Sequence, residues 1–194
     1  MNHPTKQRLL DAGMAMLLKQ SFHDLGIQAL LAATATPKGS FYHHFKDKED
    51  FALQAVGHYM CGVHEALDVC LGDTSQPPLD RVRDFFDKIQ QSYREEGYLG
   101  CFLGGLGQEL SGVSEVFRRK IDGCLTEIAD RIAVCLELAV EGGDLPAGTD
   151  PRRMASLLVD CWEGAALRSR LRGDAQPLRD MLDFYFASAV ARGA

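Results

Sequence analysis

Apolar residues recur every three or four positions along nearly the whole chain of 194 residues. Steps of three and four return to one face of an α-helix, and no strictly alternating run predicts a half-buried strand. The sequence therefore predicts an all-α fold of about nine helices. These helices are expected at residues 4–20, at 27–33, in a short stretch from Pro37, and at 48–70, 78–95, 102–111, 113–141, 151–172 and 177–192.

The second and third predicted helices are short and lie only a few residues apart. Two short helices joined in this way are typical of a helix-turn-helix. Pro37 suits the first position of the third helix, since its missing N–H needs no partner there, and Asp47 is placed to cap the long helix that follows. We therefore predict a helix-turn-helix domain over residues 1–48 and a second helical domain over residues 49–194.

The net charge of −6 argues against a general nucleic-acid binder, whose surface is usually basic. The charge is unevenly divided, however. Residues 1–50 contain six Lys or Arg and five Asp or Glu, whereas the remaining residues contain 15 and 22. This asymmetry is compatible with DNA contact through one face of the first domain.

The cysteines and the N-terminus indicate a cytoplasmic protein. The six cysteines are scattered without a CxxC pair, which predicts neither a disulfide framework nor a zinc site, and we expect no metal and no cofactor. The N-terminus lacks the basic and apolar regions of a signal peptide, and an apolar run of about 18 residues is absent. We therefore expect a soluble protein with no membrane partner.

The last two predicted helices are unusually apolar for the end of a chain. Leu157, Leu158 and Trp162 belong to the first of them, and Leu182 and Phe186 belong to the second. Such helices can bury one face in their own core and another against a second copy of the chain. This pattern predicts a homodimer through the last two helices.

The most informative stretch is Pro37–Asp50, with the sequence PKGSFYHHFKDKED. Phe41 and Phe45 are four residues apart and can anchor a short helix on the core, while the polar side chains around them point outward. The stretch resembles the recognition helix of Tet-repressor family regulators, whose usual form is S-K-G-T-L-Y-x-H-F-x-x-K-E. Arg8–Ala12 and Phe22 also match the family's first helix and the aromatic residue that follows it.

The resemblance implies a DNA-binding transcriptional regulator whose partner is double-stranded operator DNA. Thr36 and Lys38 are then expected to contact base edges. Tyr42, His44 and Lys48 are expected to contact phosphates, the last with help from the N-terminus of its helix. The other residues predicted to bind DNA are Gln28, Pro37, Gly39, Ser40 and His43.

The chain departs from the family pattern at three places in the same region. Thr34-Ala35-Thr36 replaces the common Ala-Gly-Val of the turn. Gly26 replaces the Thr or Ser that usually caps the second helix, and Gln28 stands where an Arg is frequent. These departures are compatible with the predicted fold, but they prevent the transfer of an operator sequence from relatives.

A second stretch, Gly100–Phe117, resembles the G-C-L-x-G-N-L-x-Q-E segment of a branch that includes electrophile-responsive and acrylate-responsive repressors, with Gly105 in place of Asn. The runs Trp162–Leu171 and Ala175–Leu178 are similar to the acrylate-responsive members. The resemblance implies a small-molecule effector. The predicted effector-binding or sensing residues are Cys101, Gln108, Glu109, Trp162, Glu163, Arg168 and Arg170.

These residues suit an electrophilic or carboxylate ligand. Cys101 precedes a predicted helix, whose N-terminus lowers the pKa of a thiol and favours the reactive thiolate. Arg168 or Arg170 can pair with a carboxylate, and Trp162 can wall a small pocket. The other five cysteines fall on apolar helix faces and are predicted to be packing residues. They are Cys61, Cys70, Cys124, Cys135 and Cys161.

The leading hypothesis is a repressor that a small electrophilic, carboxylate or carbonyl compound releases from its operator. One alternative is a helical interaction module that does not bind DNA. Another is a thiol-dependent enzyme in which Cys101 works with His58 or His64, but no catalytic signature surrounds these residues. We therefore predict no enzyme activity and no catalytic residue.

Overall fold

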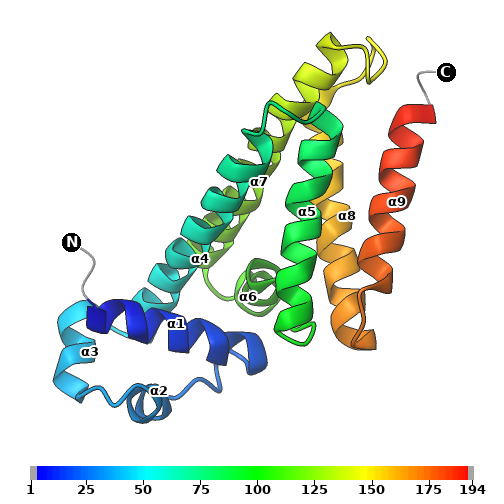
Figure 1. The fold of residues 1–194 in the computed structure, drawn as a ribbon. Helices are drawn as coiled ribbons and strands as arrows, with labels where there is room; N and C mark the ends of the chain where they lie inside the picture. The colour runs from blue at the N-terminus through cyan, green and yellow to red at the C-terminus, as the bar shows by residue number, and fades with distance from the viewer. Residues whose placement is uncertain (1–3, 192–194) are drawn as a thin grey trace. The chain divides into compact units, whose positions relative to one another are not determined.

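The computed structural model describes residues 4–191, and within this range the chain is all-α, as the sequence predicts (Figure 1). Every predicted helix is present, and no helix end differs from the prediction by more than two residues. None of these helices is both long enough and apolar enough to span a membrane. The helices are α1 (Pro4–Lys19), α2 (Ile27–Ala33), α3 (Lys38–His44), α4 (Lys48–Leu71), α5 (Pro78–Glu95), α6 (Phe102–Leu110), α7 (Glu115–Glu141), α8 (Pro151–Arg172) and α9 (Gln176–Ala191).

Side-chain caps and backbone angles explain where several helices begin and end. Asp47 caps α4 as predicted, because Asp50 N donates to Asp47 Oδ1 at 2.8 Å. α8 begins in the same way at Asp150, which accepts a hydrogen bond from Arg153 N. It ends at Gly173, whose left-handed φ of +69° is typical of the residue that follows a helix.

Pro37 lies one position earlier relative to α3 than the sequence suggests. Its φ of −62° suits a helix, but its ψ of 145° is extended, so Pro37 is the N-cap residue and α3 begins at Lys38. This cap provides no side-chain hydrogen bond, because proline has no side-chain acceptor. The N-cap residue of α2, Gly26, also provides no side-chain hydrogen bond, because glycine has no side chain.

The chain divides into two compact units, which are described separately below. Unit 1 consists of Met1–Gly62 and Phe102–Asp122, and unit 2 consists of Val63–Cys101 and Gly123–Ala194. α4 and α7 contribute residues to both units. The predicted division of function at residue 48 rests on the sequence motif and stays a prediction.

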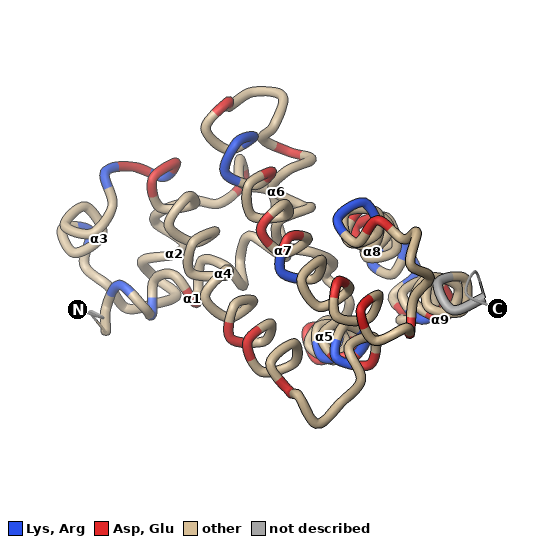
Figure 2. The backbone as a smooth tube through the Cα atoms, turned by 90° about the horizontal axis from the view of Figure 1, so that it is seen from above, with Lys and Arg blue, Asp and Glu red and all other residues tan. Residues whose placement is uncertain are grey.

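The two units differ in charge in the direction that the sequence suggests. Unit 1 contains nine Lys or Arg and eight Asp or Glu, whereas unit 2 contains 12 and 19. Figure 2 shows acidic positions along α5, α7 and α8. The excess negative charge of the protein therefore belongs to unit 2, and unit 1 is close to neutral.

Unit 1 is held by an aromatic cluster beside the short helix α3. The ring centroids of Phe41 and Phe45 are 5.0 Å apart, and both rings pack on Phe51 of α4, at 5.6 and 5.0 Å. All three side chains are at most 1% exposed, which confirms the predicted anchoring role of Phe41 and Phe45. Gly13 of α1 faces the same ring, and a Cβ atom there would lie 2.1 Å from Phe51 Cζ. α1 therefore approaches α4 more closely than an alanine would allow.

Unit 2 is organised around α8. α8 and α9 lie side by side, and α5 also contacts α9 (Figure 1). Phe86 of α5 packs on Trp162 of α8, with ring centroids 4.8 Å apart, and an ion pair joins Arg83 of α5 to Asp183 of α9. Aromatic packing therefore holds the interior of this unit, and ion pairs lie at its surface.

The cysteines are distributed differently from the prediction. Cys124 and Cys135 are buried, as expected of packing residues, and Cys70 is half-buried. Cys61 and Cys161 are exposed, so neither packs in the core of this chain as the prediction expected. Adjacent residues on a helix point about 100° apart. Because their neighbours, Met60 and Trp162, face the core, these two thiols face outward. None of the six cysteines, all within the described residues, forms a disulfide.

Candidate DNA-binding and effector sites

The turn between α2 and α3 is tied by the hydroxyl groups of two threonines. Thr34 Oγ1 donates to Leu30 O at 2.8 Å, and Thr36 Oγ1 donates to Thr34 O at 3.2 Å. Between them, Ala35 has a φ of +48°, in the left-handed region where glycine is favoured. The family pattern has glycine at this position. The chain therefore keeps the turn conformation although it lacks the residue that adopts it without strain.

Thr36 does not have the exposed surface that its predicted role requires. Its side chain is buried, with 6% exposure, because it occupies the position where the family pattern has Val. Its hydroxyl is also used within the turn. The contact of Thr36 with base edges stays a prediction. The sequence held the signal for the burial of Thr36, since a position usually filled by valine indicates burial.

The other residues predicted on the recognition helix remain accessible. Lys38 and Tyr42 lie close together, with Lys38 Nζ 5.9 Å from the centre of the Tyr42 ring. Gln28 of α2 is exposed as well. The structure therefore leaves these side chains available for DNA, and their contact with DNA stays a prediction. The exposed positions are Pro37, Lys38, Gly39, Tyr42 and His43, and the half-buried ones are Ser40 and His44.

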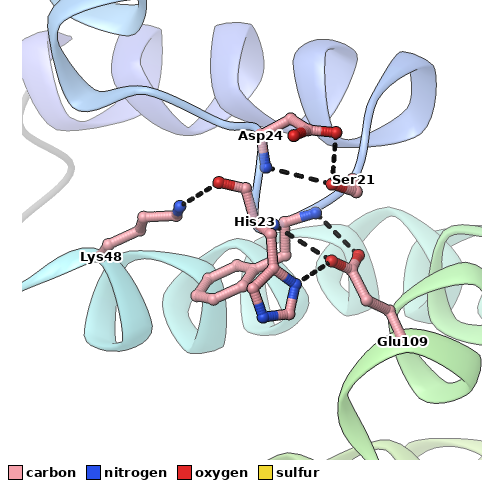
Figure 3. Close-up of polar contacts among 6 residues, drawn as sticks. Ser21, His23, Asp24, Lys48 and Glu109 are labelled. Carbon is pink, nitrogen blue, oxygen red and sulfur yellow. Dashed lines mark hydrogen bonds and ion pairs between the residues drawn. The ribbon is translucent and has the colours of Figure 1, made fainter.

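Lys48, which is predicted to contact phosphate, has partners inside unit 1. Its Nζ donates to His23 O at 3.1 Å (Figure 3) and lies 4.7 Å from the centre of the Phe22 ring. Both partners belong to the loop between α1 and α2, and Lys48 is half-buried. The Lys48 side chain therefore joins this loop to the start of α4.

Glu109, in the last turn of α6, binds the same loop. Its carboxylate accepts hydrogen bonds from Phe22 N at 2.7 Å, from His23 N at 3.1 Å and from His23 Nδ1 at 2.6 Å (Figure 3). Partial burial alone raises the pKa of Glu109, but these hydrogen bonds and the charge of His23 outweigh it, so the pKa is lowered. Both oxygens of Glu109 therefore bind the loop, and its role as a polar group of the effector site stays a prediction.

In unit 2, Cys101 contacts Glu163 of α8. The thiol is hydrogen bonded to the Glu163 carboxyl group, which is half-buried. Burial raises the pKa of Glu163, the hydrogen bond from Cys101 lowers it in part, and the charge of Asp160 raises it further. Two predicted sensing residues that are far apart in the sequence are therefore brought together.

The loop before Cys101 has an unusual backbone and packs on α8. Gly97, Tyr98 and Gly100 have positive φ values of +79°, +59° and +87°. Tyr98 is not a glycine, so the surrounding packing must hold it in this conformation. A Cβ atom on Gly100 would lie 3.4 Å from Arg170 Cδ. Gly100 therefore lets the loop lie close to the aliphatic part of Arg170, and Cys101 follows directly.

Trp162 belongs to an aromatic cluster of unit 2. The side chain is buried and packs on Phe86 and Tyr93 of α5, with ring centroids 4.8 and 5.9 Å apart. Since Trp162 immediately precedes Glu163, this cluster and the Cys101–Glu163 contact occupy the same part of α8. Gln108, in contrast, is an exposed residue of α6 and belongs to unit 1.

The last turns of α8 carry two arginines and a buried hydroxyl. Arg168 and Arg170 are exposed, and neither forms a salt bridge within residues 4–191. Ser169, between them, is 1% exposed, and its Oγ has no hydrogen-bond partner in the described part of the chain. A buried hydroxyl without a partner is costly in a folded protein.

The histidines considered for a thiol enzyme have carboxylate partners. His58 Nε2 lies 2.8 Å from Asp11 Oδ1 in unit 1. His64 Nε2 lies 2.9 Å from Glu127 Oε1 in unit 2. Nothing in this arrangement assigns either imidazole as the base for Cys101.

Sequence reasoning missed how the loop between α1 and α2 is held. Phe22 N and the Glu109 carboxylate are 87 residues apart in the sequence, and no local pattern connects them. The available signal is the Gln-Glu pair in the stretch from Gly100, but the resemblance assigns that pair to the effector. A long-range partner of this kind becomes visible only in the folded chain.

Two family models match the chain. Residues 9–55 match the model described as "Bacterial regulatory proteins, tetR family". Residues 78–185 match the model described as "Tetracyclin repressor-like, C-terminal domain". The first match contains the helix-turn-helix of α2 and α3, and the second begins at α5 and ends in α9.

Curated relatives match nearly the whole chain. The transcriptional regulator AcuR of Cereibacter sphaeroides is 35% identical over 187 residues, which cover 96% of this chain and 85% of AcuR. The HTH-type transcriptional repressor DhaR of Mycobacterium sp. (strain GP1) is 28% identical over 187 residues, which cover 96% of this chain and 93% of DhaR. Both relatives are named as regulators of transcription.

Solved structures show the same fold. A regulatory protein TetR from Rhodobacter sphaeroides has a TM-score of 0.89 at 33% identity, covering 93% of this chain and 96% of that one. The reduced form of NemR from Escherichia coli has a TM-score of 0.85 at 27% identity, covering 94% of this chain and 95% of that one. The similarity in structure therefore extends over nearly all of both chains.

Proposed function

The chain belongs to the TetR family of bacterial transcriptional regulators, and from this premise we propose that it is a cytoplasmic repressor released from its operator by a small α,β-unsaturated carboxylate or carbonyl compound. Regulators of this family bind operator DNA and form dimers. The observation that carries the effector part of the proposal is the contact of Cys101 with Glu163, beside Gly100 and Arg170.

The proposed DNA-reading surface is the outer face of α3. Lys38, Tyr42 and His43 are exposed there, while Phe41 fixes the helix to the core of unit 1. In this proposal Lys38 reaches base edges and the neighbouring polar groups contact phosphates, which set the register on the duplex. Two such helices in a dimer must lie about 34–36 Å apart to enter successive major grooves on one side of the DNA.

The proposed dimer forms through α8 and α9. Phe184 of α9 is 75% exposed, and α8 carries a stripe of exposed apolar or small residues at helical spacing. A soluble monomer rarely exposes such a continuous apolar face, and an isologous contact between two copies would cover it. The residues of the α8 stripe are Leu157, Cys161, Gly164, Leu167 and Leu171.

The chemistry around Cys101 favours an electron-poor carbonyl compound as effector. Arg168 and Arg170 have no salt bridge within the described residues and can pair with a carboxylate. Ser169 Oγ can hydrogen bond a ligand oxygen. If the Cys101 thiol adds to the double bond, Sγ bonds to the β-carbon and the thiol proton ends on the α-carbon, so the addition needs no other reactant.

The test is a fluorescence-anisotropy titration of a labelled duplex from the DNA upstream of the protein's own gene, with acrylate, propionate or N-ethylmaleimide added. Propionate is the matched control, because it has the same carboxylate without the double bond. Proteins with and without Cys101→Ser are compared in a background of Cys61→Ser, because that exposed thiol would also react with the maleimide, whereas Cys161 lies in the proposed dimer contact. We expect tight binding to the duplex and release by acrylate but not by propionate.

The outcomes distinguish the parts of the proposal. Release of both proteins by acrylate indicates reversible recognition, whereas release only of the protein that keeps Cys101 indicates addition of the thiol. If both proteins bind and no compound releases them, the effector class is wrong and the regulator remains. A protein that fails to bind the upstream duplex contradicts the proposal that it represses its own gene region.

A further inference from the structure

The binding of the loop between α1 and α2 by Glu109 is not explained by the proposed effector site. Glu109 Oε2 accepts the hydrogen bond from Phe22 N, and Oε1 accepts those from His23 N and Nδ1. The side chain of Glu109 is 21% exposed, whereas that of His23 is 67% exposed. Because both carboxylate oxygens are used and two of the donors are backbone groups, the contact fixes the path of the loop as well as the position of one side chain.

The same loop is held at further points, which Figure 3 shows together. Ser21 Oγ donates to Asp24 Oδ2 at 2.7 Å, and Asp24 N donates to Ser21 Oγ at 3.0 Å. Lys48 Nζ donates to His23 O. The loop leads into Gly26, which caps α2 without a side-chain hydrogen bond. Because this cap is bare, the position of α2 depends on the loop that precedes it.

Apolar and polar contacts of α7 support the same region of unit 1. The ring of Phe22 packs on Phe117 near the start of α7, with centroids 5.8 Å apart. Ser114 Oγ, just before α7, donates to Glu49 Oε1 in the first turn of α4 at 3.1 Å. The segment around α6 is therefore built into the unit that contains the helix-turn-helix.

We propose that Glu109 is a positioning residue for operator binding: by holding Phe22 N and His23 N, it sets the loop that fixes the start of α2 and the Lys48 side chain. The inference rests on the proposed function, because it concerns the DNA affinity of a repressor. Glu109 itself does not touch DNA in this role. A loop that adopts the DNA-binding conformation only part of the time lowers the apparent affinity in proportion to that fraction.

The proposal predicts a change in DNA affinity that is opposite to the change expected from charge alone. On electrostatic grounds alone, removing a carboxylate from a DNA-binding unit strengthens DNA binding, because it removes a repulsion of phosphates. Positioning by Glu109 predicts weaker binding instead. Glu115 provides the matched control, since it is an exposed carboxylate of the same unit whose ion pairs are with Arg118 and Arg119 of its own helix.

The experiment compares Glu109→Gln, Glu109→Ala and Glu115→Gln with wild type on the upstream duplex over a range of salt concentrations. We expect the Kd of Glu109→Gln to rise roughly fivefold to tenfold, and that of Glu109→Ala to rise further, because glutamine keeps one carbonyl acceptor. Glu115→Gln should bind no more weakly than wild type. The slope of log K against log salt should be unchanged in Glu109→Gln, because a lost phosphate contact would lower it by about 0.9.

Amide hydrogen exchange without DNA separates positioning from a general loss of structure. In Glu109→Gln the amides of Phe22 and His23 should exchange faster. The amide of Phe45, which donates to Phe41 O at 2.9 Å in wild type, should keep its exchange rate. Faster exchange at Phe45 as well would show that the substitution unfolds the recognition helix, and this would overturn a positioning role.

The DNA-binding measurements test both the positioning role and the proposed function. Equal or tighter binding by Glu109→Gln, with wild type binding the duplex, overturns this inference alone. Failure of wild type to bind the duplex overturns the proposed function, and the inference falls with it. Weaker binding with an unchanged salt slope and faster exchange confined to the loop supports the positioning role.

Discussion

Glu109 in unit 1 and Glu163 in unit 2 are the same amino acid, but their surroundings change the pKa in opposite directions. Burial raises the pKa at both positions. Glu109 also receives three N–H hydrogen bonds and the charge of His23, which together lower its pKa. Glu163 receives one hydrogen bond, from the Cys101 thiol, and its pKa stays raised. At Glu109 the donors and the charge of His23 together outweigh burial, whereas at Glu163 burial outweighs the single donor.

This difference separates an anchor from a group that can exchange partners. A carboxylate with strong backbone donors on both oxygens holds a loop, and releasing it leaves N–H groups without partners. A thiol is a weak donor, so Glu163 can give up Cys101 for a ligand at little cost. The three predictions below test this contrast.

The largest expected effect is the loss of stability when the hydrogen bonds of Glu109 are removed. Glu109→Ala leaves Phe22 N and His23 N without their acceptor, and we expect the free energy of unfolding to fall by about 2 kcal/mol at neutral pH, the size typical of hydrogen bonds to a charged group. Urea unfolding followed by circular dichroism measures the change. Glu115→Ala, which loses only exposed ion pairs, should change the stability less. Equal losses from the two substitutions would remove the special role of Glu109.

A smaller effect should appear as opposite pH dependences. The lowered pKa of Glu109 stabilises the folded state above the unfolded value of about 4.3, and this contribution disappears as the pH falls through the folded pKa. The raised pKa of Glu163 works the other way. It costs no stability below the unfolded value, and the cost develops as the pH rises through the folded pKa.

Thermal unfolding of the two glutamine variants between about pH 2 and pH 8 tests these signs. Glu109→Gln should be less stable than wild type at neutral pH and should approach it in acid. Glu163→Gln should be more stable than wild type at the alkaline end, by about 1 kcal/mol or less, and should match it in acid. Shifts of the same sign for both variants would show that the two carboxyl groups have similar environments.

The smallest effect is expected at Ala35, which touches neither glutamate. Ala35→Gly relieves a positive φ and increases the freedom of the unfolded chain, so we expect a net gain of about 0.5–1 kcal/mol. Urea unfolding measures the gain, and the pH dependence should be that of wild type. A changed pH dependence would mean that overall stability, and not the two carboxyl groups, produces the pH dependences expected of the Glu109 and Glu163 variants. A loss of stability would show that the turn is not strained.

The positions of the helices could be predicted because the signals that determine them are local. The spacing of apolar residues and the cap at Asp47 lie within a few residues of the structure they predict. The anchoring of α3 by Phe41 and Phe45 follows from the same spacing. The burial of Thr36 was predictable in principle, since the turn position it fills is usually apolar, but its hydroxyl suggested a contact with DNA.

The candidate sites were less predictable because their contacts are long-range. Glu109 and Glu163 look alike in the sequence, and only the folded chain shows that one meets backbone N–H groups and the other a thiol. The exposure of Cys61 and Cys161 depends on which face of a nearly continuous apolar helix turns inward. Periodicity alone does not settle that choice when several faces are apolar.

The close approach of α1 to α4 has a consequence for how the sequence can diverge. Gly13 has no room for even one methyl group, because the Phe51 ring fills that space and is itself held by Phe41 and Phe45. Gly13 is therefore not free to mutate to a larger residue while Phe51 is kept. Lineages that lose the glycine should also carry a smaller side chain in place of the phenylalanine. Positions 13 and 51 are therefore expected to covary.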